Sequence, residues 1–141
     1  MKPLQFTEEI ATGDEAIDSD HQQLIELAKQ LREFDTRVDP NKVTAALINL
    51  AGITARHFDS EDALMEETNY PRIEGMRLQH QRLLNEVDVV LTAWKQEKSI
   101  SGISSMIYYL LTDWFFQHII EWDRDLAIHA RTTRNTAVPK P

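Results

Sequence analysis

Histidines and a glutamate occupy positions where a helical core would normally hold apolar side chains. In the stretch "ITARHFDSEDALM", His57 and Glu61 lie four residues apart and continue a stripe of Leu47, Leu50 and Thr54 that recurs at helical spacing. Residues four apart project from one face of a helix toward one point. An imidazole and a carboxylate placed in this way could act together as metal ligands.

Three more histidines fall on the inward faces of other predicted helices: His21, His80 and His118. A single histidine of this kind is more often a satisfied core residue than a ligand. With 23 acidic residues among 141, an acid four residues after a histidine is also common. Here each of four helices buries an imidazole at a similar depth. Separate explanations for the four are harder to accept, because each unpaired buried polar group would cost several kcal/mol of folding free energy. A shared metal is the economical partner, and imidazole with carboxylate suits iron, manganese or zinc.

Four long amphipathic helices are needed to position these side chains. The hydrophobic periodicity predicts them over residues 19–37, 40–67, 71–98 and 103–129, behind an extended N-terminal arm. Asp39 and Pro40 can start the second helix, and "TNYP" and "KSISG" mark the later breaks. Short connections predict an all-α fold, namely an antiparallel up-down-up-down four-helix bundle at about 19–130 in one domain spanning 1–141.

The composition excludes several kinds of binding partner and of metal site. The formal net charge is −8, so neither a nucleic acid nor an anionic membrane surface is expected as a partner. There are no cysteines, which excludes thiolate zinc sites, iron–sulfur clusters and disulfides. The N-terminal "MKPLQFTEEI" lacks the apolar run of a secretory signal, and no stretch is apolar for long enough to span a bilayer. We therefore expect a cytoplasmic protein, whose polar outer faces permit a monomer.

Taken together, the ligand-bearing segments resemble the hemerythrin family, specifically its single-domain bacterial members. "IDSDHQQLIEL" is similar to the first-helix segment with His21, and "HFDSEDALM" to the His-x-x-x-Glu segment with His57 and Glu61. "YPRIEGMRLQHQRLL" stands in the place of the His-x-x-x-His segment, and "WFFQHIIEWD" is similar to the His-x-x-x-x-Asp segment with His118 and Asp123. The likeness runs in order from about residue 6 to about residue 126.

The resemblance implies a cofactor of two iron ions joined by an oxo or hydroxo bridge and by the carboxylates of Glu61 and Asp123. One iron would take His21 and His57 and keep an open position where dioxygen binds. In the family the other iron takes three histidines. Dioxygen is therefore the expected small-molecule partner.

The inclusion of Asp123 depends on the family pattern alone. It follows His118 by five residues, which is about 140° further round an ideal α-helix, so helical spacing would not have selected it. Asp125 and His129 lie outside the pattern, and we expect both on the surface.

Met76 departs from the family pattern. The family's third helix carries two histidines four apart; here the second is His80, and the first position holds Met76. Met76 can be core packing, with water or hydroxide completing the iron, or it can ligate weakly through its thioether. In a third alternative the site holds iron poorly.

Two aromatic residues before His118 are expected to line an oxygen pocket. They are Trp114 and Phe115, the latter at a position where many family members have leucine, and plain core packing is the alternative for both. The leading interpretation is an oxygen-binding carrier, store or sensor rather than an enzyme. Met76 favours a second interpretation, a di-iron oxidase or peroxide-handling enzyme, and a metal-poor bundle is the third.

Overall fold

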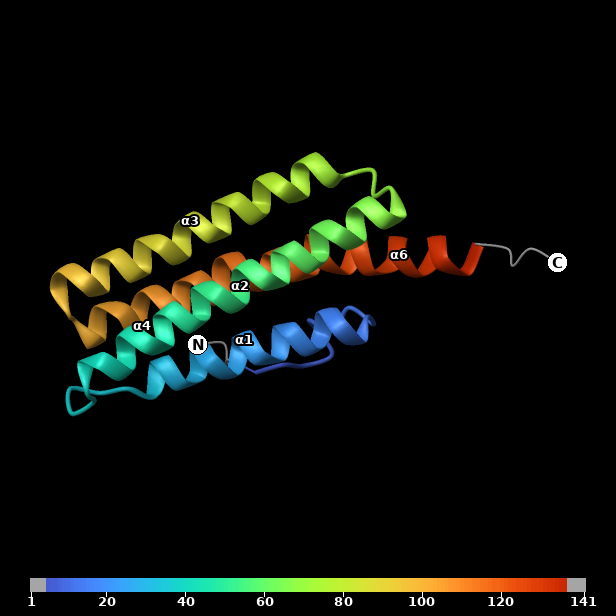
Figure 1. The fold of residues 1–141 in the computed structure, drawn as a ribbon. Helices are drawn as coiled ribbons and strands as arrows, with labels where there is room; N and C mark the ends of the chain where they lie inside the picture. The colour runs from blue at the N-terminus through green and yellow to red at the C-terminus, as the bar shows by residue number, and fades with distance from the viewer. Residues whose placement is uncertain (1–4, 137–141) are drawn as a thin grey trace.

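The computed structural model describes residues 5–136, which form four long helices packed side by side (Figure 1). Three of them are α1 (Glu15–Glu33), α2 (Pro40–Thr68) and α3 (Ile73–Glu97). The fourth is continuous and consists of α4 (Ile100–Tyr109), η1 (Leu110–Phe115), α5 (Phe116–His118), η2 (Ile119–Asp123) and α6 (Arg124–Thr136). Successive helices run in opposite directions, and α2 and the fourth helix each pack against both α1 and α3. The predicted all-α four-helix bundle is confirmed, and residues 5–136 contain no strand.

Side-chain caps move two helix starts away from the predicted positions. Asp14 accepts a hydrogen bond from the backbone N–H of Ile17, so α1 begins four residues earlier than expected and ends at Glu33 rather than at residue 37. Ser99 accepts a hydrogen bond from the backbone N–H of Gly102, and the fourth helix therefore begins at residue 100 rather than 103.

The other breaks lie close to their predicted places. Asp39 caps α2 and Pro40 occupies its first turn. Asn69, in "TNYP", ends α2 in the left-handed conformation with φ 51°, and Lys98 ends α3 with φ 53°. The fourth helix continues to residue 136, beyond the predicted end at 129, whereas residues 137–141 of the expected polar tail and residues 1–4 of the expected arm lie outside the described residues.

Two segments of the fourth helix, η1 and η2, are π-helical. The backbone N–H of Phe116 donates to the carbonyl of Leu111, and the N–H of Arg124 donates to the carbonyl of Ile119, so both bonds span five residues. A π-helical turn places residues five apart on the same face, and such turns often occur at functional sites. The inward stripe of this helix therefore departs from α-helical spacing at two points.

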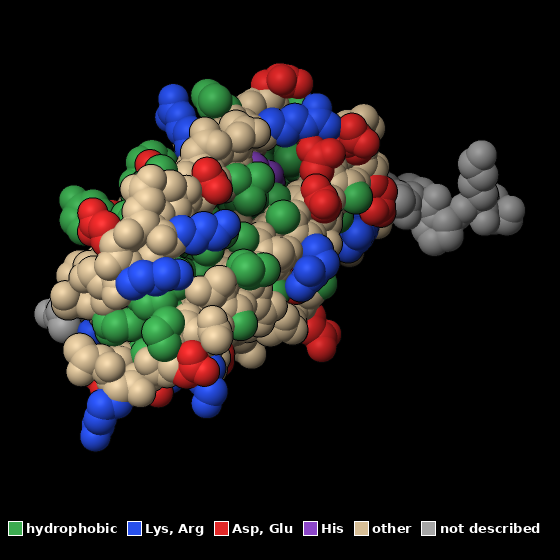
Figure 2. All heavy atoms as spheres, turned by 60° about the vertical axis from the view of Figure 1, so that its left-hand side comes forward, with side chains coloured by type: hydrophobic (Ala, Val, Ile, Leu, Met, Phe, Trp, Pro, Cys, Tyr) green, Lys and Arg blue, Asp and Glu red, His purple; other side chains and the backbone are tan. Residues whose placement is uncertain are grey.

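Two apolar clusters lie at different levels of the bundle. The larger cluster includes Leu24, Leu50, Leu83 and Ile107, and the smaller one consists of Met65, Tyr70, Met76 and Leu126 with their partly buried neighbours. On the face shown in Figure 2, acidic, basic and apolar side chains are interspersed. None of the described helices combines the length and apolar character needed to cross a membrane.

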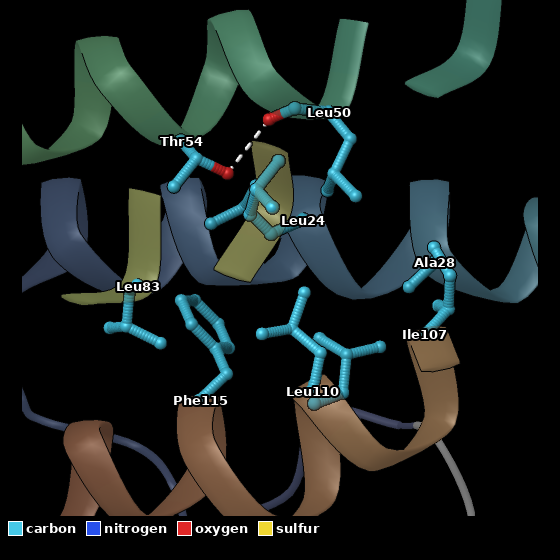
Figure 3. A pocket seen from close by; sticks show the side chains of 10 residues that line it. Leu24, Ala28, Leu50, Thr54, Leu83, Ile107, Leu110 and Phe115 are labelled. Atoms are coloured by element: carbon cyan, nitrogen blue, oxygen red, sulfur yellow. Dashed lines mark hydrogen bonds between the residues drawn. The ribbon is translucent and has the colours of Figure 1, made fainter. Parts of the chain in front are cut away.

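A small cavity lies inside the larger cluster (Figure 3). Its volume, measured as the space open to the centre of a water molecule, is about 20 Å³. All but one of its lining side chains are apolar: Leu24, Ala28, Leu50, Leu83, Val87, Ile107, Leu110, Leu111 and Phe115. The exception is Thr54, whose hydroxyl donates a 2.7 Å hydrogen bond to the carbonyl of Leu50, so the cavity presents almost no polar surface.

Candidate metal centre

Six buried polar side chains from all four helices meet between the two apolar clusters. They are His21 of α1, His57 and Glu61 of α2, His80 of α3, His118 at the end of α5 and Asp123 at the end of η2. Their relative exposure is between 0% and 6%. Along α2, α3 and the fourth helix, these residues separate the part that contributes to the larger cluster from the part that contributes to the smaller one. The structure thus brings together all six residues predicted as metal ligands, five of them from helical spacing and Asp123 from the family pattern.

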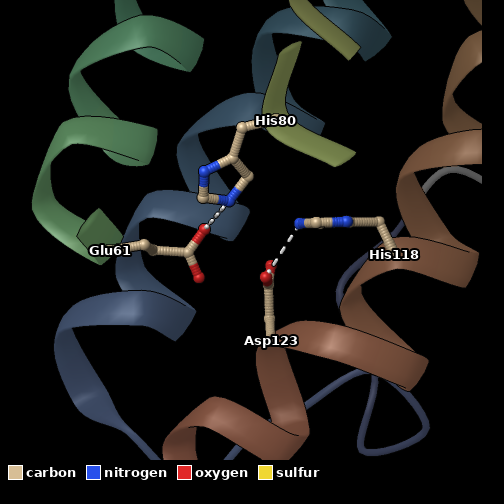
Figure 4. A group of neighbouring side chains, drawn as sticks. All are labelled: Glu61, His80, His118 and Asp123. Atoms are coloured by element: carbon tan, nitrogen blue, oxygen red, sulfur yellow. Dashed lines mark ion pairs between the residues drawn. The ribbon is translucent and has the colours of Figure 1, made fainter. Parts of the chain in front are cut away.

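The six side chains form two groups that share Asp123. One group is His21, His57 and Asp123, and the other is Glu61, His80, His118 and Asp123. In each group one potential ligand atom from every residue lies within 4.8 Å of the others. Figure 4 shows the second group, in which the two imidazoles and the two carboxylates point into a common space.

Each carboxylate lies between histidines of both groups. Glu61 Oε1 is 3.2 Å from His57 Nε2 and 3.2 Å from His80 Nε2. Asp123 Oδ2 is 2.8 Å from His21 Nε2, and its other oxygen, Oδ1, is 3.0 Å from His118 Nε2. A carboxylate that faces two ligand sets in this manner has the arrangement needed to bridge two cations.

Many of these polar atoms have no hydrogen-bond partner among residues 5–136. The buried and unpartnered atoms are both oxygens of Glu61 and of Asp123, both ring nitrogens of His118, His21 Nδ1 and His80 Nε2. The short nitrogen–oxygen separations therefore come from atoms aimed at common points rather than from well-directed hydrogen bonds. Because buried polar groups are normally paired, this concentration of orphaned donors and acceptors calls for a cation. Imidazole and carboxylate together fit iron, manganese or zinc.

The electrostatics of the site also favour added positive charge. Burial lowers the pKa of His57, but its contacts with the carboxylates of Asp123 and Glu61 outweigh burial and raise that pKa to about 11. Burial raises the pKa of Asp123, yet the neighbouring imidazoles, above all His118, hold it well below its usual range. Without a cation, protonated imidazoles must balance the buried carboxylates. A metal ion would take over that charge and release the protons.

The sequence of residues 12–127 matches the family profile described as "Hemerythrin HHE cation binding domain". This chain belongs to the hemerythrin family. The matched range contains all six clustered residues, so the family assignment and the buried cluster concern the same part of the chain.

Curated relatives carry the name bacteriohemerythrin. The chain is 24% identical over 115 residues to the bacteriohemerythrin of Campylobacter jejuni subsp. jejuni, covering 81% of this chain and 85% of that protein. It is 25% identical over 119 residues to that of Stenotrophomonas maltophilia, and 22% identical over 119 residues to that of Pseudomonas aeruginosa. Each of these two matches covers 84% of this chain and 76% of the relative.

Within this hemerythrin domain, Met76 is fully buried in the smaller apolar cluster, where it packs with Met65, Tyr70 and Leu126. It lies on α3 four residues before His80, and therefore on the same side of the helix. Each of the two ligand groups accordingly contains two histidines.

The two aromatic residues expected at the oxygen pocket occupy different places in the hemerythrin fold. Phe115 is buried, lines the internal cavity and makes an edge-on contact with the His21 ring at 5.5 Å between centroids. Trp114 is half-buried and lines an outer groove with Tyr109 and Met106, so the structure does not bring it to the cavity. Phe115 follows two other cavity residues, Leu110 and Leu111, by five and four residues along the π-helical segment η1.

Two residues expected to be surface groups prove to have specific partners. Asp125 accepts hydrogen bonds from the Tyr70 hydroxyl at 2.6 Å and from Arg72 at 3.3 Å. His129 is half-buried, and its Nε2 donates to the carbonyl of Thr68 at 2.8 Å. Both contacts join α6 to the end of α2 and the following turn. Asp125 keeps the expected surface position, since its side chain is 47% exposed, whereas His129 is more buried than expected.

The sequence did not point to two neighbours of the ligands. The ring of Phe58 stacks on that of His80, with 3.9 Å between centroids and 9° between planes. Asp20 Oδ2 lies 2.8 Å from His57 Nδ1, across the contact between α1 and α2. Nothing near either residue in the sequence indicates its contact with a ligand. A phenylalanine such as Phe58 is common in any core, and Asp20 is 37 residues from the histidine that it contacts.

Proposed function

We propose that this hemerythrin-family chain is a non-haem di-iron protein that binds dioxygen and acts as a carrier, store or sensor. The observation that supports it best is the sharing of Glu61 and Asp123 between two pairs of histidines, all buried and largely without hydrogen bonds to one another. A site for a single ion would need only one of the two groups. Two carboxylates that each face both groups favour a two-ion centre, and the likeness to the hemerythrin family adds an oxo or hydroxo bridge.

The residues divide between the two ions according to the groups. His21 and His57 would hold one iron, His80 and His118 would hold the other, and Glu61 with Asp123 would bridge them. Two iron ions in this position would supply reversible electron exchange with dioxygen. The protein's part is to hold the imidazoles apart in fixed directions and to keep bulk water away, which the near-complete burial of the six side chains achieves.

The internal cavity supports the proposal that the ligand is small and apolar. The lining residues Leu24, Thr54, Leu83 and Phe115 are each three residues from one of the four histidines, on α1, α2, α3 and the fourth helix. The cavity therefore lies about one helical turn from the centre. A site of this size can hold a molecule as small as water, but its apolar wall offers too few hydrogen bonds to retain one. Dioxygen, which is small and apolar, matches the polarity of this wall.

Metal analysis combined with oxygen titration tests the proposal. We expect two irons per chain after anaerobic reconstitution with ferrous iron, and absorption bands that appear on adding oxygen and disappear when it is removed. Asp123→Asn should lose iron because it removes the shared charge, whereas Asp125→Asn, two residues away and outside the cluster, should retain it. Failure to take up two irons, or uptake without any oxygen-dependent spectral change, would contradict the proposal.

Met76 supports a second candidate, a di-iron oxidase or peroxide-handling enzyme. The iron held by His80 and His118 would have two histidine ligands where the family has three, because Met76 packs in the smaller apolar cluster. A position left to solvent there would admit a second reactant. Catalytic consumption of hydrogen peroxide over many cycles, absent from the iron-free protein, would favour the enzyme over the carrier.

We further propose a cytoplasmic monomer that binds neither nucleic acid nor membranes. The acidic, cysteine-free composition supports this, as do the charged side chains interspersed with apolar ones on the face shown in Figure 2. Light scattering on the iron-loaded protein tests the oligomeric state, and fractionation of the native cells tests the location.

A further inference from the structure

We propose that Asp20 is a positioning residue that orients His57 for metal binding, an inference that rests on the proposed metal centre. Asp20 Oδ2 lies 2.8 Å from His57 Nδ1. The other ring nitrogen of His57, Nε2, faces the cluster, at 3.1 Å from His21 Nε2 and 3.2 Å from Glu61 Oε1. One side of the imidazole is thus held by a carboxylate, while the other is directed at the metal site.

The chemistry of imidazole explains what this contact does. A neutral imidazole carries one proton, and a carboxylate accepts a hydrogen bond but does not donate one when ionised. Asp20 therefore keeps the proton of metal-bound His57 on Nδ1 and leaves the Nε2 lone pair for the metal. It also fixes the rotation of the ring and raises the basicity of the ligating nitrogen.

His57 differs in this support from His21 and His118. The Nδ1 atoms of His21 and His118 are buried and have no hydrogen-bond partner in the part of the chain that the structure describes. Their orientation depends on packing, such as the contact between the rings of His21 and Phe115. His57 has a directed hydrogen bond instead.

Asp20 occupies the boundary between the centre and solvent. The side chain of Asp20 is 36% exposed, whereas that of His57 is 1% exposed. Both residues, together with Glu61, line a groove between α1 and α2 that opens to the surface. His57 is thus a buried ligand beside an opening, where thermal rotation of the ring would let water reach the metal. The hydrogen bond from His57 to Asp20 opposes that rotation.

Zinc binding to the full chain tests this role without depending on iron or oxygen. Chelator competition should show that Asp20→Ala weakens Zn²⁺ binding by about 10- to 100-fold, the usual effect of removing such a partner. Asp20→Asn keeps an oxygen that can accept from Nδ1 and should recover part of the loss. The matched control is Asp59→Ala, which removes an exposed carboxylate on α2 two residues after His57. It should leave affinity unchanged.

The proton on His57 Nδ1 gives a readout that a purely structural role would not change. In the Zn²⁺-loaded wild type, NMR should show a slowly exchanging imidazole N–H resonance that Asp20→Ala alone abolishes, while circular dichroism shows that the variant remains helical. Unchanged Zn²⁺ affinity in Asp20→Ala, an equal loss in Asp59→Ala, or no Zn²⁺ binding by the wild type would overturn the proposal. If the wild type binds Zn²⁺ through an Asp20-dependent His57, but the same protein loaded with iron shows no oxygen response, the oxygen-binding function is refuted and this inference stands.

Discussion

His118 Nε2 and Asp123 Oδ1 lie 3.0 Å apart although the two residues are five positions apart along one helix. In an α-helix, Asp123 would lie about 140° further round and would face away from the imidazole. The segment between them, η2, is π-helical, and a π-helical turn returns to the same face after five residues. The geometry of the candidate centre therefore depends on a local departure from α-helical winding.

Changing the length of η2 tests this dependence. Deletion of the exposed Glu121 should convert η2 into an ordinary α-helical turn, in which His118 and the aspartate are four residues apart and still share a face. We expect metal binding to remain within about tenfold of the wild type. Insertion of an alanine after Glu121 should instead rotate the carboxylate away and abolish binding. Metal content by mass spectrometry of the native protein distinguishes the two, and loss of metal in the deletion variant would show that the π-helical geometry itself is required.

The π-helical segments also explain where sequence reasoning succeeded and where it failed. Constant α-helical spacing correctly predicted the inward positions of His21, His57 and His80, because α1, α2 and α3 are regular around them. In the fourth helix the same spacing excluded Asp123, which only the family pattern supplied, and it also turned Trp114 inward. Helical periodicity assumes the same number of residues in every turn. The inward position of Asp123 and the outward position of Trp114 could therefore not be derived from it.

Contacts between distant segments were the other limit. The hydrogen bond of Asp20 to His57 and that of Tyr70 to Asp125 join residues 37 and 55 positions apart. Charged residues at these positions look solvated in the sequence, since their partners become neighbours only when the helices pack. By contrast, the start of α2 could be predicted because Asp39 and Pro40 act locally.

Substitution of Met76 tests whether the departure from the family pattern limits metal binding. Met76→His should raise metal retention, because it adds an imidazole on the same face of α3 four residues before His80. We expect at least a tenfold slower loss of iron to a chelator. Met76→Leu conserves volume and should leave the rate unchanged. If Met76→His instead destabilised the protein by about 1–3 kcal/mol without slowing iron loss, the new imidazole would be buried without reaching the metal.

The stability of the iron-free protein should depend on pH in a direction set by His57. Its pKa is raised from 6.5 to about 11 in the folded chain, so protonation favours folding. That contribution is fully present below pH 6.5 and is lost as the pH rises from 6.5 toward 11. Urea denaturation of the iron-free protein should therefore show a falling free energy of unfolding over this range.

Acid should also destabilise the iron-free protein, through Asp123. Its pKa is held well below 3.8, so its stabilising contribution is present above pH 3.8 and is lost as the pH falls through the folded value. In the iron-loaded protein the metal replaces the proton on Nε2 of His57, and the decline above pH 6.5 should disappear. A flat profile for the iron-free protein between pH 6.5 and 10 would contradict the assigned electrostatics.

Phe115 should control access of the gas to the centre, because it lines the cavity and contacts the His21 ring. Phe115→Leu removes ring atoms from the wall and should enlarge the cavity, at a cost of about 1–3 kcal/mol in the free energy of unfolding. We expect faster dioxygen association in stopped-flow measurements and tighter xenon binding, which reports cavity volume independently of iron. Phe116→Leu is the matched control, since Phe116 is also buried but lines an outer pocket with Ile10 and Ile120. This control should lose similar stability without changing the rate of dioxygen association or the affinity for xenon. If both variants bound dioxygen equally faster, a general loosening of the fold, rather than the cavity wall, would govern the access of dioxygen to the centre.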